Sequence, residues 1–158
     1  CLHDENHYTT PYDLYLIFKA ALDNPTFYKI DSTPEYEIPA TNMNGARKLS
    51  MGHQMVVGNY DYPAAIAGKT GQTDQAGRTL VTYAEQDGIR LISVIMKSTN
   101  DAFYDDTRKL LDEGFSIQEA EKEKENRHET PVRTFIQAFP AAHGDMCSIR
   151  RLRYTYYT

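Results

Sequence analysis

A short run near the middle of the chain holds the residue types with the clearest chemical use. It reads Gly68-Lys69-Thr70-Gly71-Gln72-Thr73 and precedes two β-rich runs that flank Asp87-Gly88. A lysine ammonium is a compact positive charge that suits a carboxylate, and threonine hydroxyls add hydrogen-bond donors. Glycine lets another backbone approach closely because it has no side chain. The run therefore predicts a binding site for a ligand that ends in a carboxylate.

The strand geometry of this run predicts how its groups are presented. Side chains alternate along a strand, so Lys69 and Gly71 should point one way and Thr70 the other. The backbone of Gln72 would lie along the strand edge, where a peptide can pair as an added strand. A backbone N–H aimed at a developing oxyanion is worth ~3 kcal/mol of barrier. On these six residues alone, a polar strand end with a solvated lysine is an equally good interpretation.

A nucleotide site is the main chemical alternative for Gly68-Lys69-Thr70. A P-loop requires a glycine where this chain has Pro63, and a helix after the Lys-Thr pair. Here Gly71 follows at once and β-rich runs follow that. Without a glycine-rich turn the backbone amides cannot cradle phosphates, so the sequence disfavours this alternative.

Local signals on both sides of the run predict the elements that position it. Thr10 and Pro11 are a good N-cap and first residue for a helix that stops at Asn24-Pro25. The Asp87-Gly88 pair predicts a tight β-hairpin. Further expected elements are a helical turn at Thr26–Ile30, strands at Tyr36–Ile38, Lys48–Met51 and Ala64–Gly71, the hairpin strands Arg78–Gln86 and Ile89–Lys97, and a helix from Asp101 to Glu113.

These elements predict an α+β fold, an antiparallel sheet with flanking helices. The second hairpin strand is apolar on both faces, which predicts a central strand covered on each side. Thr99 or Asn100 should cap the last helix, and Gly114 should end it. The domain organisation follows as one domain over 1–115 and a polar linker and tail over 116–158, because Glu119–Glu129 is almost wholly charged and polar.

Composition excludes several classes of function. The 158 residues include 25% charged residues and carry a net charge of -5, which argues against nucleic acid as the main partner. The basic-aromatic end around Arg150–Arg153 is too short to change this expectation. No apolar run is long enough to span a membrane. His3 and His7 have a metal-compatible spacing but no third ligand, and we expect no metal and no cofactor.

The stretch from Leu2 to Phe115 resembles the D-alanyl-D-alanine carboxypeptidases of the penicillin-binding serine-peptidase class. The resemblance rests on segments in the family's order: Leu2–Thr10, the helix Tyr12–Ala21, Asn24-Pro25-x-Phe27, Thr41-Asn42, Gly68–Gly77 with its Lys-Thr-Gly, the hairpin Leu80–Met96, and Lys109-Leu110-Leu111-x-x-Gly114-Phe115. Together these motifs are specific, although no single one is. The resemblance implies part of the penicillin-binding and β-lactamase-like transpeptidase fold.

What the resemblance implies about function is serine acyl transfer on peptidoglycan stem peptides ending in D-Ala-D-Ala. In that family a serine attacks the bond between the two D-alanines, and a lysine one helical turn later acts as its base. Carried over, Lys69 and Thr70 would hold the terminal carboxylate, and Gln72 would supply a backbone amide of the oxyanion hole, with Gly71 and Thr73 beside them. β-Lactams would be ligands, and the location would be the cell envelope.

The chain departs from the family at the nucleophile. No serine in it is followed three residues later by lysine, and Ser98-Thr99-Asn100 matches Ser-x-Asn only out of order. We therefore assign no catalytic residue in this chain and expect no turnover from it alone. The alternatives that stay open are a non-catalytic module for peptidoglycan peptides or β-lactams and a truncated inactive product. A missing N-terminal half, or self-association, would cover the sheet.

Overall fold

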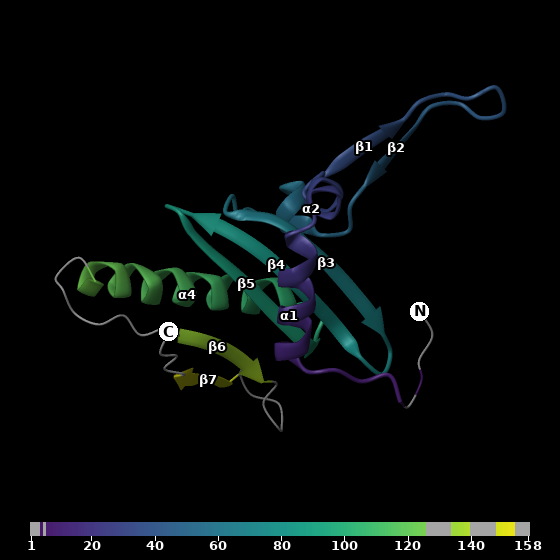
Figure 1. Ribbon diagram of the computed structural model, residues 1–158. Coiled ribbons are helices and arrows are strands. Elements are labelled where there is room, and N and C mark those ends of the chain that lie inside the picture. Colours follow the sequence, from purple (N-terminus) through teal and green to yellow (C-terminus); the bar gives the residue numbers. More distant parts are fainter. Residues whose placement is uncertain (1–3, 5, 126–133, 140–147, 154–158) are drawn as a thin grey trace.

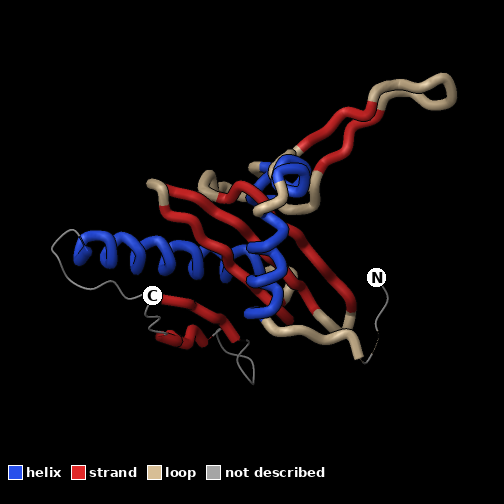
Figure 2. Tube along the Cα trace, in the orientation of Figure 1, coloured by secondary structure: helices blue, strands red, loops and turns tan. Residues whose placement is uncertain are grey.

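The fold is built around a three-stranded antiparallel sheet with helices on both faces (Figure 1). The structure is a computed structural model that describes residues 4, 6–125, 134–139 and 148–153. In chain order the elements are α1 (Pro11–Leu22), α2 (Pro25–Asp31), β1 (Glu35–Ile38), β2 (Arg47–Ser50), α3 (Gln54–Val57), β3 (Ala65–Thr73), β4 (Gly77–Gln86), β5 (Ile89–Ser98), α4 (Phe103–Glu125), β6 (Thr134–Phe139) and β7 (Ser148–Arg153). The predicted α+β class is confirmed, and Figure 2 shows the helices in blue and the strands in red.

The central sheet has the strand order β3-β4-β5. The β4–β5 hairpin turns at Asp87 and Gly88, whose φ angles are 51° and 72°. Two successive positive φ angles match the twist of a tight hairpin, so the prediction from the Asp-Gly pair is confirmed. The expectation that β5 is central is wrong within the described residues, because β4 pairs on both sides and β5 on one.

Helix α1 starts where its local sequence predicts. The Thr10 side chain accepts the backbone N–H of Asp13 at 3.1 Å, and Pro11 takes the first helical position, where a missing N–H has no consequence. Asn24 caps α2 in the same way, accepting the N–H groups of Thr26 at 2.9 Å and Phe27 at 3.2 Å. Helix α2 therefore follows α1 after a short break, and it contains the predicted helical turn.

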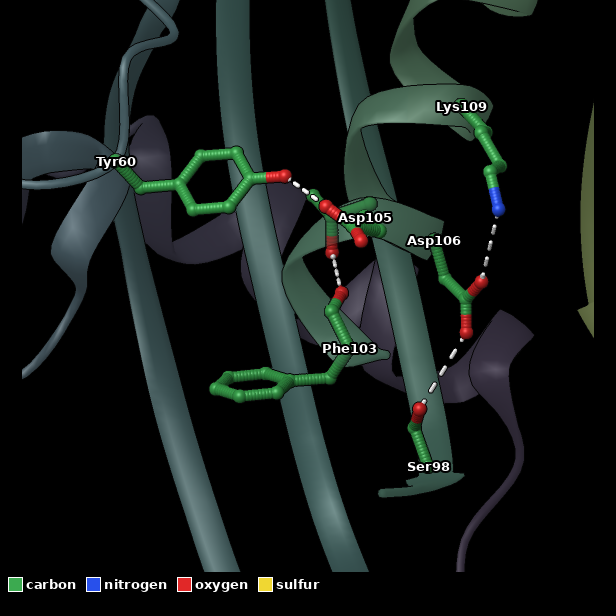
Figure 3. Close-up of polar contacts among 7 residues, drawn as sticks. Tyr60, Ser98, Phe103, Asp105, Asp106 and Lys109 are labelled. Atoms are coloured by element: carbon green, nitrogen blue, oxygen red, sulfur yellow. Dashed lines mark hydrogen bonds and ion pairs between the residues drawn. The ribbon is translucent and has the colours of Figure 1, made fainter. Parts of the chain in front are cut away.

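Helix α4 is hydrogen-bonded to the end of β5 and to the loop before β3 (Figure 3). Ser98 donates to Asp106, which also pairs with Lys109 at 3.9 Å, and the Tyr60 hydroxyl donates to Asp105. The helix covers one face of the sheet through two buried clusters. These clusters comprise Leu80, Ile95, Phe103 and Leu110, and Ala84, Ile89, Leu111 and Phe115.

Both predicted ends of this last helix are wrong. It begins at Phe103, and the Asn100 side chain accepts from Arg78 Nε at 2.5 Å. It continues through Gly114 to Glu125, because Gly114 serves packing and not termination. A Cβ at Gly114 would lie 2.9 Å from Leu91 Cδ1, so the glycine lets the helix approach β5 closely. The predicted start of the tail at Ser116 falls inside α4, where Ile117 is buried.

The other face of the sheet is covered by α1 and α2 through Phe18, Ala67 and Tyr83, with Phe27 packed against them. The β1–β2 hairpin extends away from this body (Figure 1), and both of its strands match predicted ones. Strands β6 and β7 form a separate antiparallel pair. Among the described residues, no helix has the length and apolarity needed to cross a bilayer.

Candidate functional site at the β3 edge

All five residues assigned to substrate binding lie on β3, which is an edge strand. Strand β4 pairs with one side of β3, and no described strand pairs with the other. The N–H and C=O groups along that free side can hydrogen-bond an extended chain, which is how peptides add to sheets. The strand passes straight through Lys69 and Thr70, so a phosphate-binding loop is excluded at this position.

Lys69 lies on the face of the sheet that α1 and α2 cover. Ala67 lies two residues earlier on β3 and therefore on the same face, where it packs against Phe18 and Tyr83. Its side chain is exposed, and Nζ donates to the backbone oxygen of Thr70 at 2.5 Å. An ammonium has three donors, so this one bond leaves capacity for an anionic ligand. The role of this lysine toward a ligand stays a prediction.

Asp31, at the C-terminal end of α2, adds a second charge-bearing group near this lysine. Burial raises the pKa of the Asp31 carboxyl, while the backbone of Gly68 and the charge of Lys69 lower it by less. Its Oδ2 is buried and has no hydrogen-bond partner among the described residues. Sequence analysis did not single out Asp31, because only the packing of α2 on β3 brings it near a residue 38 positions later in the chain.

Thr70 and Gly68 face the opposite side of the sheet, where α4 lies. A Cβ built on Gly52 would lie 3.2 Å from Thr70 Oγ1, so the backbone at Gly52 packs directly against this threonine. Gly68 faces His53 in the same way. The predicted separation of Lys69 from Thr70 by strand alternation therefore agrees with their surroundings.

The remaining three residues contribute differently from one another. Gln72 is exposed, and its backbone continues the free edge of β3. The Thr73 hydroxyl accepts the N–H of Ala76 at 3.0 Å, so its oxygen stabilises the β3–β4 turn. A Cβ at Gly71 would lie 2.5 Å from Thr79 Oγ1, so this glycine makes room for the neighbouring strand. Their roles toward a substrate stay predictions.

His53 is a residue of this region that the sequence analysis did not single out. It is 1% exposed, and its Nε2 lies 2.8 Å from Thr82 Oγ1. Burial lowers the pKa of its imidazole to about 4, so the ring is neutral at physiological pH. Its Nδ1 is buried without a hydrogen-bond partner among the described residues. No local sequence signal identifies it, because Thr82 is 29 residues away.

The described residues place an exposed ammonium beside a strand edge that has no described partner, and none of their serines hydrogen-bonds a lysine or a histidine. Ser98 lies at the end of β5, and its hydroxyl donates to Asp106 at 3.4 Å. Within the described residues no group of three or more His, Cys, Asp or Glu is placed to hold a metal ion. An antiparallel sheet between helices, with Lys-Thr-Gly on its exposed edge, is typical of the penicillin-binding serine peptidases.

Comparison with known proteins places the chain within that class. A family model described as D-alanyl-D-alanine carboxypeptidase matches residues 1–100. The chain is 34% identical over 117 residues to the D-alanyl-D-alanine carboxypeptidase DacB2 of Mycobacterium tuberculosis, covering 69% of this chain and 37% of that protein. The chain therefore belongs to the D-alanyl-D-alanine carboxypeptidase family, and it spans well under half the length of this relative.

Two solved structures extend this comparison. A mutant of the Streptomyces K15 DD-transpeptidase matches with a TM-score of 0.65 and 27% identity, over 73% of this chain and 45% of that one. Penicillin-binding protein D2 of Listeria monocytogenes, in a cefotaxime-bound form, matches with a TM-score of 0.59 and 25% identity, over 72% and 44%. The fold is thus that of the penicillin-binding peptidases, over the part that this chain covers.

Proposed function

We propose that this chain is the substrate-binding part of a serine-type D-Ala-D-Ala carboxypeptidase acting on peptidoglycan stem peptides. The observation that carries the proposal is the exposed Lys69 ammonium on an edge strand whose outer side has no partner in the described residues. A stem peptide ends in a carboxylate and has an extended backbone. The ammonium matches the first feature, and the free edge of β3 matches the second.

In this proposal each β3 residue has a distinct task. Lys69 attracts the terminal carboxylate, and the Thr70 hydroxyl completes its binding. The Gln72 backbone N–H lies along the free edge, where it can stabilise the oxyanion that forms when the peptide carbonyl is attacked. Gly71 and Thr73 shape the strand on either side of it. The carboxyl of Asp31 lies near Lys69 and offsets part of its positive charge.

The nucleophile belongs, in this proposal, to another part of the catalytic domain. The chain has no Ser-x-x-Lys, and its relative DacB2 is covered over only 37% of its length. The α1–α2 side also exposes large apolar side chains, with Ile17 63% and Ile30 69% exposed. Apolar surface of this kind marks a contact face. We assign it to the segment that supplies the serine, with a second copy of this chain as the other candidate.

The binding part of the proposal is tested by titrating the 158-residue chain with Nα-acetyl-L-Lys-D-Ala-D-Ala, followed by calorimetry. We expect measurable binding that Lys69→Met abolishes or weakens at least about tenfold, because one charge-assisted contact is worth about 1.5–3 kcal/mol. Lys48→Met, which removes an exposed lysine of β2, is the matched control and should bind like the wild type. The same peptide with an amidated C-terminus should not bind. Equal binding of acid and amide would reject the proposal.

The catalytic part is tested by covalent labelling with a fluorescent penicillin. We expect no label on the chain alone, since β-lactams acylate the family's serine. Label and release of D-alanine should appear when the chain is mixed with a separately made segment that carries Ser-x-x-Lys. Covalent label on the chain alone would reject the assignment of the nucleophile to another segment.

A non-catalytic module that binds peptidoglycan peptides or β-lactams is the second candidate function. The lack of a Ser-x-x-Lys in the sequence favours it. Peptide binding that persists while no complementing segment restores D-alanine release would support this candidate. Both functions place the chain in the cell envelope, where the substrate is. An inactive truncated product is the outcome if neither binding nor complementation occurs.

A further inference from the structure

We propose that His53 is a positioning residue that fixes the backbone of β3 on both sides of Lys69. The inference rests on the proposed function, because it explains how the carboxylate-binding lysine is held. We call the four residues involved, Gly52, His53, Thr82 and Tyr104, the His53 support. They come from the α3 corner, from β4 and from α4, and they meet behind β3 on the face opposite Lys69.

The imidazole of His53 lies directly against Gly68, the residue before Lys69. A Cβ at Gly68 would come within 2.6 Å of His53 Cδ2, closer than two such atoms can approach. The same Cβ would meet the backbone oxygen of Val81 at 2.3 Å, so β3 is also held tightly against β4 here. The histidine ring and the neighbouring strand therefore explain the glycine at position 68. The ring limits how closely β3 can approach the α3 corner.

Thr82 holds the ring in this orientation. It is fully buried, it lies opposite Gly68 in the β3–β4 register, and its Oγ1 is 2.8 Å from His53 Nε2. A hydroxyl can donate or accept, so either neutral tautomer of the ring satisfies this bond. The contact joins the α3 corner to β4 across the residue that precedes Lys69.

Tyr104 hydrogen-bonds the backbone of both residues that flank His53. Its hydroxyl oxygen accepts the N–H of Gln54 at 2.8 Å, and the hydroxyl donates to the carbonyl of Gly52 at 3.4 Å. The rings of His53 and Tyr104 also meet edge to face, with centroids 5.8 Å apart. The corner is thus clamped between α4 and β4, which are both anchored in the core that α4 covers.

The support reaches the residue after Lys69 as well. The backbone at Gly52 packs against Thr70 Oγ1, since a Cβ there would lie 3.2 Å from it. Residues 52 and 53 therefore back both neighbours of Lys69, while the lysine itself points to the opposite face. A shift of the ring would move Gly68 and Thr70 together and carry the ammonium and the edge amides with them.

The experiment uses backbone amide exchange and chemical shifts of the ¹⁵N-labelled chain, together with the affinity for Nα-acetyl-L-Lys-D-Ala-D-Ala. Thr82→Val removes the hydroxyl and keeps the shape, and His53→Leu removes the ring nitrogens. Thr82→Ser and His53→Gln restore a hydrogen-bonding group and are the matched controls. We expect Thr82→Val and His53→Leu to speed exchange at residues 68–70 relative to 92–94 of β5, and to weaken peptide binding roughly fivefold, the effect of about one hydrogen bond.

The outcomes separate positioning from plain stabilisation. Faster exchange spread evenly over β3, β4 and β5, or unchanged peptide affinity in Thr82→Val, would overturn the inference. Recovery by Thr82→Ser and His53→Gln would support it. If His53→Leu does not fold, Thr82→Val decides alone, because valine suits a buried strand position. If the wild type binds no peptide, the proposed function fails, and the pattern of exchange still decides whether the His53 support positions β3.

Discussion

The helices on the two faces of the central sheet bury their apolar side chains to very different degrees. On the α4 face, Leu80 and Leu111 are each 1% exposed and belong to two closed clusters. On the α1 face, Phe18 is buried, but Ile17 on the same helix is 63% exposed and Leu16 is 44% exposed. The α4 face is thus a complete core, while the α1 face presents apolar surface for a further contact. Lys69 points to the incomplete face, and its support lies on the complete one.

This difference teaches how the site is divided. On one side, β4, α4 and the His53 support contact β3 at both neighbours of Lys69, and we propose that they position it. The open part, formed by Lys69, Asp31 and the exposed side of α1, is where a substrate and a nucleophile-bearing segment would meet. Stability should therefore depend on the α4 face, and association should depend on the α1 face.

The largest expected effect comes from truncating the α4 core. Leu111→Ala removes a side chain packed against Ala84, Ile89 and Phe115, and we expect it to lower the free energy of unfolding by about 2–5 kcal/mol. Ile17→Ala is the matched truncation on the α1 face and should change it by less than about 0.5 kcal/mol. Denaturant unfolding measures both. Similar losses at the two positions would contradict the difference between the faces.

The second effect is a pH dependence of stability that originates on the α4 side. The imidazole of His53 has a folded-state pKa of about 4, below the 6.5 of an unfolded histidine. Between pH 6.5 and 4 the unfolded chain binds a proton on this histidine and the folded chain does not. The free energy of unfolding is therefore highest above pH 6.5 and falls as the pH drops toward 4. The expected loss is about 3 kcal/mol.

The variant His53→Gln separates this effect from that of the carboxylates. It should lack the part of the decline that lies between pH 6.5 and 4, as measured by urea unfolding at stepped pH. A wild-type curve that is parallel to the His53→Gln curve over this window would show that the histidine is not buried as a neutral group.

A smaller effect is expected from the cap of α2, which belongs to the open face. Asn24→Ala removes the acceptor for the N–H groups of Thr26 and Phe27, and we expect a loss of about 1 kcal/mol in the free energy of unfolding. Asn24→Asp keeps the acceptor and should stay close to the wild type. Helix α2 packs on the α1 face through Phe27. A loss as large as that of Leu111→Ala would therefore mean that the α1 face contributes as much to the core as the α4 face.

The smallest effect on stability, and the clearest on association, is expected at the exposed side of α1. Ile17→Glu places a charge where a contact face is proposed, and it should leave the free energy of unfolding within about 0.5 kcal/mol of the wild type. Sedimentation at increasing concentration should show less self-association than in the wild type. A variant that associates as strongly as the wild type would exclude the exposed side of α1 from a contact between two copies of this chain.

Much of the fold was predictable because its signals are local. Thr10 with Pro11 specifies the start of α1, and Asp87-Gly88 specifies the hairpin through backbone conformation. The errors arose where a residue serves a distant partner. Gly114 looks like a helix end, but it makes room for Leu91, and Asn100 looks like a cap, but it bonds Arg78. Within the described residues β5 pairs only with β4, and apolar content on both faces of a strand does not reveal such pairing.

The site was predictable in part for the same reason. Lys69 and Thr70 could be assigned to opposite faces because strand alternation is a local rule. His53 and Asp31 could not be assigned, because each acts through a residue that only the folded chain brings near. Residues 1–3, 5, 126–133, 140–147 and 154–158 lie outside the described structure, so the metal-compatible spacing of His3 and His7 and the tyrosines at the C-terminal end stay untested.

The most direct test of the central claim follows the side-chain ammonium and ε-methylene resonances of Lys69 during titration with Nα-acetyl-L-Lys-D-Ala-D-Ala. The account predicts a saturable shift at Lys69, accompanied by shifts of the amides at 68–72, and no such shifts with the C-terminally amidated peptide. Shifts elsewhere with Lys69 unchanged, or the same response to the amide, would contradict the claim that this lysine binds the terminal carboxylate.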